Sequence, residues 1–407
     1  MAAAPGEDLT PPLLPPPKME KKDPSYLDNP PVLLATAVWS SLPDDLVRRI
    51  AGSFLATNDV DCYMCFRAVC LSWRAATDDP RNNPSAPRFQ PRRWVVLEEA
   101  HGKLLLLNTS TGRFLHKKLP PPLLRECYVV VTTPTGYVVL ADTSPPHAAR
   151  LFNPLTGVLT RFAAPVPAGA SVADICCNKD RSLLAMIMLG DSPRRSYTAA
   201  ANSESFTVKD CPEGPYNFFR NMVVGGAYEH ISGPAFLSVL AGLFGHLRSL
   251  HADPAKAFSS DYPGDAYDMH CFLVALDAHM VLVTKAFGCL LLFKVDTEVA
   301  KIQPVQSIST FAIFIGHRRC LSVDATKFPG INANCVYYTQ HLGSSARICK
   351  YNLKNKKTEW ISEAAEFVKQ DKQQFALVAD RPFTTIQLLC SYTINVPDSQ
   401  LALQQMS

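Results

Sequence analysis

Cysteine pairs and scattered aspartates are the residues of this 407-residue chain whose types could support chemistry. Cys62 and Cys65 have the spacing of half a zinc site or of a redox pair, but no second Cys or His pair with matching spacing follows. Cys176-Cys177 and His270-Cys271 are adjacent within apolar segments that favour strands, where neighbouring side chains point to opposite faces. We therefore interpret these thiols as structural. Four aspartates could supply carboxylate pairs for acid–base work, although the sequence brings no two of them together: Asp174, Asp268, Asp277 and Asp324.

The usual signatures of catalysis are absent from the sequence. It contains no Gly-rich phosphate loop, no nucleophile elbow, no zincin helix and no glycine fingerprint for a dinucleotide. We therefore expect a non-catalytic protein with no cofactor and no bound metal. An enzyme or a sugar-binding protein would need paired carboxylates in one place.

Composition narrows the classes of partner. The formal net charge of +4 comes from nearly equal numbers of acidic and basic residues. The sequence has no long run of Lys and Arg that could contact a phosphate backbone, so we expect no nucleic-acid partner. Thirteen scattered cysteines favour reduced thiols and a reducing compartment. The N-terminus lacks a basic start followed by an apolar region, and the apolar runs are too short to span a bilayer. We expect location in the cytoplasm, the nucleus or both, and no membrane partner.

Residues 39–77 carry the densest apolar patterning in the N-terminal part. Pro43 suits the first turn of a helix, and the acids that follow favour its positive end. Leu46, Val47 and Ile50 then mark one face of this first helix. We interpret that face as a candidate docking surface, because so small a segment has little core of its own in which to bury such residues.

The second half of this segment has an apolar stripe as well. Phe66, Val69, Cys70 and Trp73 recur at spacings of three to four residues, which favours a helix. Two helices are then available to hold one partner. The alternative is an ordinary helical hairpin packed on its own domain.

The same residues resemble an F-box, whose opening LPxDLxxxI and closing FRxVCxxWR match Leu42 to Ile50 and Phe66 to Arg74. The resemblance implies a three-helix module that binds a Skp-type adaptor, which hangs from a cullin scaffold with its RING protein. The linker at 51–63 departs from the pattern and leaves the start of the second helix open. The adaptor-binding positions carried over by the resemblance are Leu42, Pro43, Leu46, Val47, Ile50, Phe66, Val69, Cys70 and Trp73.

Two stretches rich in proline flank this module. Residues 1–37 cannot bury enough apolar surface to offset their ordering entropy, which predicts a disordered tail. After a module at 38–78, residues 79–93 are expected to form a linker into a second domain at 94–400. Short runs with β-type composition follow in that domain: Trp94 to Leu97, Lys103 to Leu107, Tyr128 to Thr132, Tyr137 to Leu140, Ala149 to Phe152, Phe272 to Leu276, Met280 to Thr284 and Leu290 to Val295.

A recurring phrase places Asn after an apolar or aromatic residue and before a turn. It begins at Asn108, Asn153 and Asn352, with a weaker copy at Asp296. The Asn side chain can cap the turn, so each copy predicts a hairpin between two strands. The spacing of the copies is in the range of propeller blades and predicts about six blades.

This domain resembles the C-terminal KIB-type, kelch-like domain of a large plant F-box family. The resemblance rests on Leu151 to Gly157, on Phe293 to Asp296 and on Phe314 to Thr339, and it implies a β-propeller. We interpret Phe328-Pro329-Gly330 as a turn that ends one blade strand, and Cys335 to Tyr338 as a buried inner strand of the following blade. Residues 190–265 depart from the family pattern and predict an insertion, with a helix at 234–250 that is either a substrate-contacting excursion or a tolerated loop.

The expected fold is thus α plus all-β, with a small N-terminal three-helix F-box module followed by a large β-propeller. The resemblance implies a substrate-recognition subunit of a Skp-cullin-F-box ubiquitin ligase, whose propeller binds an unknown protein target. Such a receptor would promote ubiquitin transfer only by holding the target close to the ubiquitin-charged conjugating enzyme. The alternative from another class is a non-degradative interaction scaffold that uses the propeller.

Overall fold

The computed structural model describes residues 39–100, 102–168, 170–177, 183–190, 195–210, 270–276, 279–286, 289–296, 301–316, 319–340, 347–362, 366–370, 374–378 and 384–394. The chain divides into two compact units, residues 1–42 and 43–407. In the first unit the described residues form the 3-10 helix η1 (Trp39–Ser41). The predicted tail at 1–37 lies outside the described residues.

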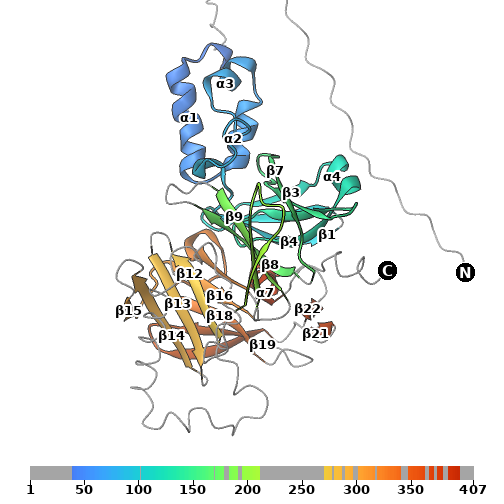
Figure 1. Ribbon diagram of the computed structural model, residues 1–407. Helices are drawn as coiled ribbons and strands as arrows, with labels where there is room; N and C mark the ends of the chain where they lie inside the picture. The colour runs from blue at the N-terminus through green and yellow to red at the C-terminus, as the bar shows by residue number, and fades with distance from the viewer. Residues whose placement is uncertain are drawn as a thin grey trace, which may run out of the picture. The chain divides into compact units, whose positions relative to one another are not determined.

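Three helices open the second unit: α1 (Asp44–Ala56), α2 (Val60–Arg67) and α3 (Leu71–Ala76). They lie side by side (Figure 1). Asp44 and Asp45 stand in the first turn of α1, where the helix dipole favours negative charge. The Asp59 carboxylate caps α2 by accepting a hydrogen bond from the Cys62 backbone N–H at 3.2 Å. The Asp59 cap fixes the start of α2, which the sequence left open.

The three helices share an interior of their own. Val47, Phe66 and Trp73 are buried, and the rings of Phe66 and Trp73 stack with centroids 4.3 Å apart. The buried guanidinium of Arg67 donates to the Thr77 carbonyl and hydroxyl. The guanidinium of Arg48 donates to the Ala76 carbonyl at 3.2 Å. A buried charge satisfied in this way ties α2 to the end of α3.

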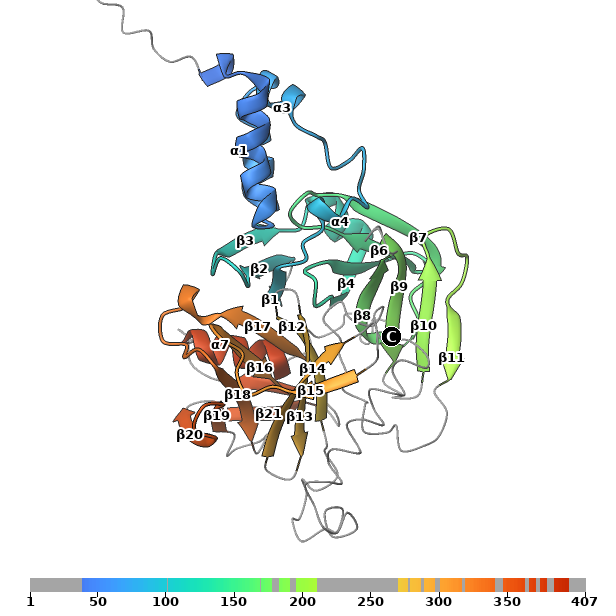
Figure 2. The same ribbon diagram turned by 90° about the vertical axis from the view of Figure 1, so that its left-hand side faces the viewer.

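Six antiparallel or mixed sheets follow the helices, and we number them in chain order. Sheet I contains β1 (Trp94–Ala100), β2 (Lys103–Asn108) and β3 (Phe114–Lys118). Sheet II contains β4 (Cys127–Thr132), β5 (Val138–Asp142), β6 (Ala148–Phe152) and β7 (Leu159–Pro165). Sheet III contains β8 (Ala170–Cys177), β9 (Leu183–Gly190), β10 (Arg195–Ala200) and β11 (Thr207–Asp210), which lie side by side in Figure 2.

The later sheets complete the architecture. Sheet IV contains β12 (His270–Leu276), β13 (His279–Ala286), β14 (Cys289–Asp296) and β15 (Lys301–Pro304). Sheet V contains β16 (Phe311–Ile315), β17 (Cys320–Asp324), β18 (Cys335–Gln340), β19 (Arg347–Asn352) and β20 (Lys357–Ser362). Sheet VI contains β21 (Glu366–Gln370) and β22 (Gln374–Val378). Short helices η2 (Pro87–Phe89), α4 (Pro121–Glu126) and η4 (Ala325–Lys327) and the C-terminal α7 (Thr385–Ile394) connect or follow them.

The repeated Asn phrases form the predicted hairpin turns. The Asn108 side-chain oxygen accepts from the backbone N–H groups of Ser110 and Thr111, between β2 and β3. Asn153 does the same between β6 and β7, and Asn352 between β19 and β20. Four residues after the first two Asn residues, a glycine takes a positive φ of 72–74°. The sequence prediction of Asn-capped hairpins is confirmed.

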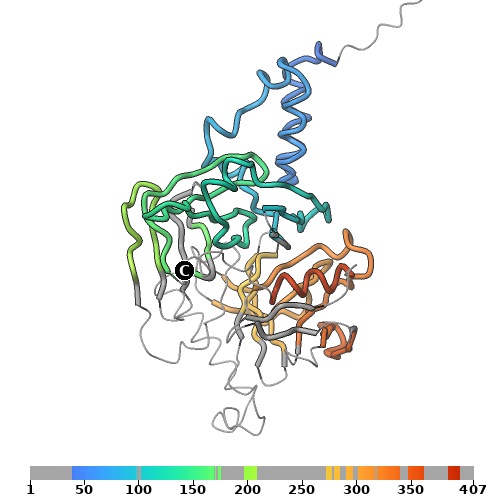
Figure 3. Tube along the Cα trace, turned by 90° about the vertical axis from the view of Figure 1, so that its right-hand side faces the viewer, coloured from blue at the N-terminus to red at the C-terminus, as the bar shows by residue number. Residues whose placement is uncertain are grey.

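Apolar clusters join neighbouring sheets and define their packing order. One cluster lies between sheets I and II, a second between II and III, a third between IV and V, and a fourth between V and I. The fourth also contains Leu389, Cys390 and Tyr392 of α7, which lies in red against the orange strands of sheet V in Figure 3. Sheets of antiparallel strands packed face to face, with the late sheet V against the early sheet I, form a β-propeller.

Three expectations differ from the structure or lie beyond it. In the described ranges four sheets have four or more strands, which differs from the expected six blades. Phe328-Pro329-Gly330 does not separate two blades, because β18 pairs in parallel with β16 inside sheet V. The chain returns there to its own sheet through η4. Of the predicted insertion at 190–265, residues 211–265 lie outside the described residues, including the expected helix at 234–250.

Candidate functional site

The first helix presents an exposed apolar strip beside its buried face. Leu46 and Ile50, one turn apart, expose 40% and 38% of their surface, and Pro43 is exposed at the start of the helix. Val47 and Ala51, which alternate with them, are buried against the other helices. Exposed charged residues surround the strip. Leucine and isoleucine held at the surface in this spacing form a face suited to a partner.

The turn between α2 and α3 adds a second exposed apolar feature. Val69 is 60% exposed and Leu71 is 80% exposed. The backbone of Cys70, between them, is extended and its sulfur caps α3 by accepting from the Trp73 N–H at 3.5 Å. Because this turn breaks the helix, the predicted stripe from Phe66 to Trp73 is not one continuous helical face.

The nine positions carried over by the F-box resemblance therefore fall into three groups. Val47, Phe66 and Trp73 are buried within the helices and present no surface in this conformation. These three side chains pack in the interior of the helices and so hold the exposed residues in position. Leu42 and Cys70 are partly exposed. Those that are exposed are Pro43, Leu46, Ile50 and Val69.

Sequence reasoning missed Leu71, the most exposed large apolar side chain among the described residues. It lies at the first position of α3, outside the i, i+3, i+4 pattern that drew attention to its neighbours. The only signal available was its place directly after the capping residue Cys70.

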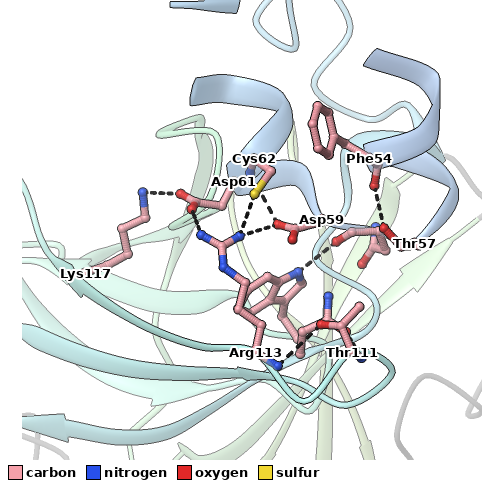
Figure 4. A network of polar contacts seen from close by, with 11 residues as sticks. Phe54, Thr57, Asp59, Asp61, Cys62, Thr111, Arg113 and Lys117 are labelled. Atoms are coloured by element: carbon pink, nitrogen blue, oxygen red, sulfur yellow. Dashed lines mark hydrogen bonds and ion pairs between the residues drawn. The ribbon is translucent and has the colours of Figure 1, made fainter. Parts of the chain in front are cut away.

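A charged cluster joins α2 to sheet I (Figure 4). The Arg113 guanidinium, at the start of the β3 segment, contacts the carboxylates of Asp59 at 2.6 Å and Asp61 at 2.7 Å. Lys117 on β3 contacts the other oxygen of Asp61 at 2.5 Å, and the Asp61 side chain is 4% exposed. Burial acts to lower the pKa of Arg113, but the hydrogen bond that Arg113 donates to Asp61 and the charge of Asp59 leave the pKa raised. Charge-assisted bonds of this kind fix the orientation of the helix on the blade.

Asn58 ties the same end of the helices to the propeller through backbone groups. Its side chain donates to the Gln90 carbonyl at 2.8 Å and accepts from the Arg93 N–H at 2.9 Å. Its carbonyl accepts the Trp94 indole N–H at 2.8 Å. Asn58 has a φ of 55°, a conformation that Asn tolerates better than most residues. The stretch at 79–93, expected to be a linker, is thus packed against both neighbours around buried Phe89.

The chemical candidates of the sequence form no centre in the described ranges. Cys62 accepts a hydrogen bond from Arg113 at 3.0 Å, while Cys65 is exposed. No group of three or more His, Cys, Asp or Glu side chains among the described residues is placed to hold a metal ion. Asp324 caps η4 through the Thr326 N–H. Asp268 and Asp277 lie outside the described residues. In the described part of the chain, no helix has the length and apolar composition needed to cross a membrane.

The fold and this junction define a β-propeller protein with a helical module attached to its first sheet. Comparison with known families adds that residues 85–355 match the KIB1-4 beta-propeller, and the chain belongs to that family. This confirms the KIB-type resemblance. Comparison with curated proteins found no match.

Solved structures give only distant similarities. The WD40 domain of SCAP from fission yeast is 9% identical, with coverage of 71% of this chain and 67% of that one and a TM-score of 0.20. A putative exported protein from Bacteroides fragilis is 10% identical, with coverage of 62% and 80% and a TM-score of 0.26. An uncharacterized protein from Listeria monocytogenes is 10% identical, with coverage of 62% and 89% and a TM-score of 0.22. TM-scores this low support no conclusion on fold or function.

Proposed function

We propose that this chain is a non-catalytic substrate-recognition subunit of a Skp-cullin-F-box ubiquitin ligase. Helices α1–α3 bind the Skp-type adaptor, and the propeller binds a protein target in the cytoplasm or nucleus. The observation that carries the proposal is the set of exposed apolar side chains on the very segment that resembles an F-box: Leu46, Ile50, Val69 and Leu71. A KIB1-4 propeller is compatible with the receptor role.

The exposed set is large enough to support a stable interface. Each large apolar side chain removed from water contributes about 1.5–3 kcal/mol of gross burial free energy. Part of that gain offsets the loss of rotational and translational freedom on association. The helices bring their own packed interior to the interface, so the partner covers a preformed face.

The test is co-purification of the full chain with a Skp-type adaptor. Leu46→Asp places a charge in the proposed interface and is expected to weaken binding at least about 100-fold, because a buried carboxylate without a partner is costly. Leu124→Asp is the matched control, since Leu124 is comparably exposed on α4 of the propeller. Val69→Asp and its control Val208→Asp on β11 repeat the comparison at the second feature.

Equal adaptor binding by wild type and by Leu46→Asp and Val69→Asp would overturn the assignment of this face. Trp73 is unsuitable for the test because it is buried, so its truncation would disturb the helices themselves. Delivery of a target is tested separately. If target abundance is insensitive to cullin inhibition while adaptor binding persists, the chain is a scaffold and not a ligase receptor.

A further inference from the structure

The hairpin of β19 and β20 concentrates positive charge in one place on the propeller. Residues 347–362 contain one acidic side chain, Glu359, and five basic ones: Arg347, Lys350, Lys354, Lys356 and Lys357. The net charge of this hairpin, +4, equals the formal net charge of the whole chain. The remaining residues are therefore neutral in sum, and the hairpin is a place where an attraction for acidic partners would arise.

Three lysines at and directly after the hairpin turn, which we call the turn lysines, are available to an outside partner. The Lys350 ammonium contacts the Glu359 carboxylate at 2.7 Å and the Asn332 side-chain oxygen at 3.2 Å. Lys354, Lys356 and Lys357 are exposed, and in the described ranges none of them forms an ion pair. The one acid of the hairpin is thus already engaged, whereas the three turn lysines are not neutralised.

The same hairpin ends in an open sheet edge. The strand order of sheet V is β17-β16-β18-β19-β20, so β20 is the terminal strand. It pairs with β19 in antiparallel register from Asn352 opposite Lys357 to Cys349 opposite Trp360, and the register then shifts at Ile361 before Ile348 lies opposite Ser362. No described strand pairs with its other edge. Alternate backbone N–H and C=O groups along such an edge match the backbone of an added strand.

Two apolar side chains stand exposed on this edge strand. Trp360 is 48% exposed and Ile361 is 37% exposed. The guanidinium carbon of Arg347 lies 4.2 Å from the centroid of the Trp360 indole, which holds the ring in place. Lysines on an edge strand also prevent aggregation, but that role alone favours polar neighbours and leaves a Trp and an Ile on the strand unexplained.

We propose that β20 binds an extended acidic segment of another protein, which pairs its backbone with the open edge and places carboxylates against Lys354, Lys356 and Lys357. The exposed indole of Trp360 would cover an apolar side chain that alternates with those carboxylates. A strand edge favours a peptide over a nucleic acid, because its backbone groups have counterparts in another peptide and none in a sugar–phosphate chain. This binding does not depend on the adaptor.

The probe is a fluorescein-labelled peptide in which glutamate and valine alternate, measured by anisotropy against the full chain. It is expected to bind, and to bind more weakly as salt increases, because the attraction is between exposed charges. A peptide with lysine in place of glutamate tests charge. A peptide with proline in place of valine tests backbone pairing, because proline donates no hydrogen bond. Each is expected to bind at least about tenfold more weakly.

Variants of the chain locate the site. Lys354→Glu, Lys356→Glu and Lys357→Glu together are expected to weaken binding at least about tenfold, by repulsion between like charges. The matched control changes three exposed lysines on other blades by the same charge: Lys103→Glu, Lys118→Glu and Lys301→Glu. A melting curve checks the fold, and the milder Gln substitutions at the same three turn lysines serve if the Glu variant unfolds.

Several results would overturn the proposal. They are the absence of peptide binding by the wild type, equal weakening by the two triple variants, or equal binding of the proline peptide. Tighter binding of single-stranded DNA of equal charge would also overturn it, since DNA cannot pair with a strand edge. Leu46→Asp is expected to weaken adaptor binding and to leave peptide affinity unchanged. The variant therefore distinguishes a failure of this proposal from a failure of the proposed adaptor binding.

Discussion

Cys70 and Cys62 show how two thiols acquire opposite properties within one helical module. A hydrogen bond with the Ser72 hydroxyl and another from the Trp73 N–H lower the pKa of the Cys70 thiol. Burial, followed by the negative charge of Asp59, raises the pKa of the Cys62 thiol in spite of Arg113. Burial, hydrogen bonds and neighbouring charges therefore decide which of the two forms a thiolate more readily.

We expect iodoacetamide at mildly alkaline pH to alkylate Cys70 faster than Cys62 in the folded chain. A lowered pKa increases the thiolate fraction at a given pH below it, and the thiolate is the nucleophile. Peptide mapping by mass spectrometry over time gives both rates in one sample. Faster modification of Cys62 would contradict the assignment of these environments.

Cys127 and Cys320 serve as internal references in that experiment. Burial raises the pKa of Cys127 to about 11 and that of Cys320 to about 12. Both are expected to stay unmodified until denaturant is added.

At the scale of elements, the contact between α2 and sheet I depends on Arg113. Arg113→Met keeps much of the side-chain length but leaves Asp59 without its guanidinium partner and Asp61 with Lys117 alone. Because Asp61 is nearly buried, we expect the free energy of unfolding to fall by about 1–3 kcal/mol. Arg125→Met on the exposed side of α4 is the control and is expected to change it by less than about 0.5 kcal/mol. Equal melting temperatures for the two variants would show that the cluster contributes nothing to stability.

The sequence predicted elements well where local chemistry decides them. Asn108, Asn153 and Asn352 cap their own turns, so the hairpins around them follow from a few adjacent residues. The face of a helix that stays exposed was harder to predict. Periodicity marks Val47 and Leu46 alike as apolar, but the contact with the other helices buries one and leaves the other open.

At the scale of the whole molecule, α7 closes the structure against the loop after β16. A Cβ added at Gly316 would clash with the Thr393 carbonyl oxygen. The same carbonyl accepts a hydrogen bond from the Arg319 backbone N–H at 3.1 Å, and the Arg319 guanidinium lies over the Tyr392 ring. Only glycine allows so close an approach of the two backbones.

Gly316→Ala is therefore expected to destabilise the chain by about 1–3 kcal/mol, because the loop or α7 must shift. Gly52→Ala is the control with the opposite sign. Gly52 lies inside α1 with no heavy atom within 4 Å of the added Cβ, so alanine is expected to stabilise the chain by about 0.5–1 kcal/mol. Chemical denaturation of both variants gives the two signs. A stabilising Gly316→Ala would contradict the tight contact with Thr393.

The global pairing of strands lay beyond the sequence. The spacing of the Asn phrases indicated a propeller, and the family match confirms it, but the described ranges contain four sheets of four or more strands where spacing predicted about six blades. The parallel pairing of β16 with β18 depends on contacts between Phe314 and Tyr337, which are far apart in the chain and stack with centroids 4.6 Å apart. No local sequence pattern predicts that β18 pairs with β16 in the same sheet.

The seam between the helices and sheet I has a practical consequence for anyone dissecting this protein. Val60 of α2 belongs to the same apolar cluster as Trp94 and Leu106, and Asn58 receives the Trp94 indole N–H. A fragment that begins at β1 would lack Val60 and Asn58. It would expose this apolar cluster to solvent and leave the Trp94 indole N–H without its acceptor. Such a fragment is expected to bind other proteins non-specifically through this exposed apolar surface. A search for targets with the fragment would therefore recover such proteins together with any specific target.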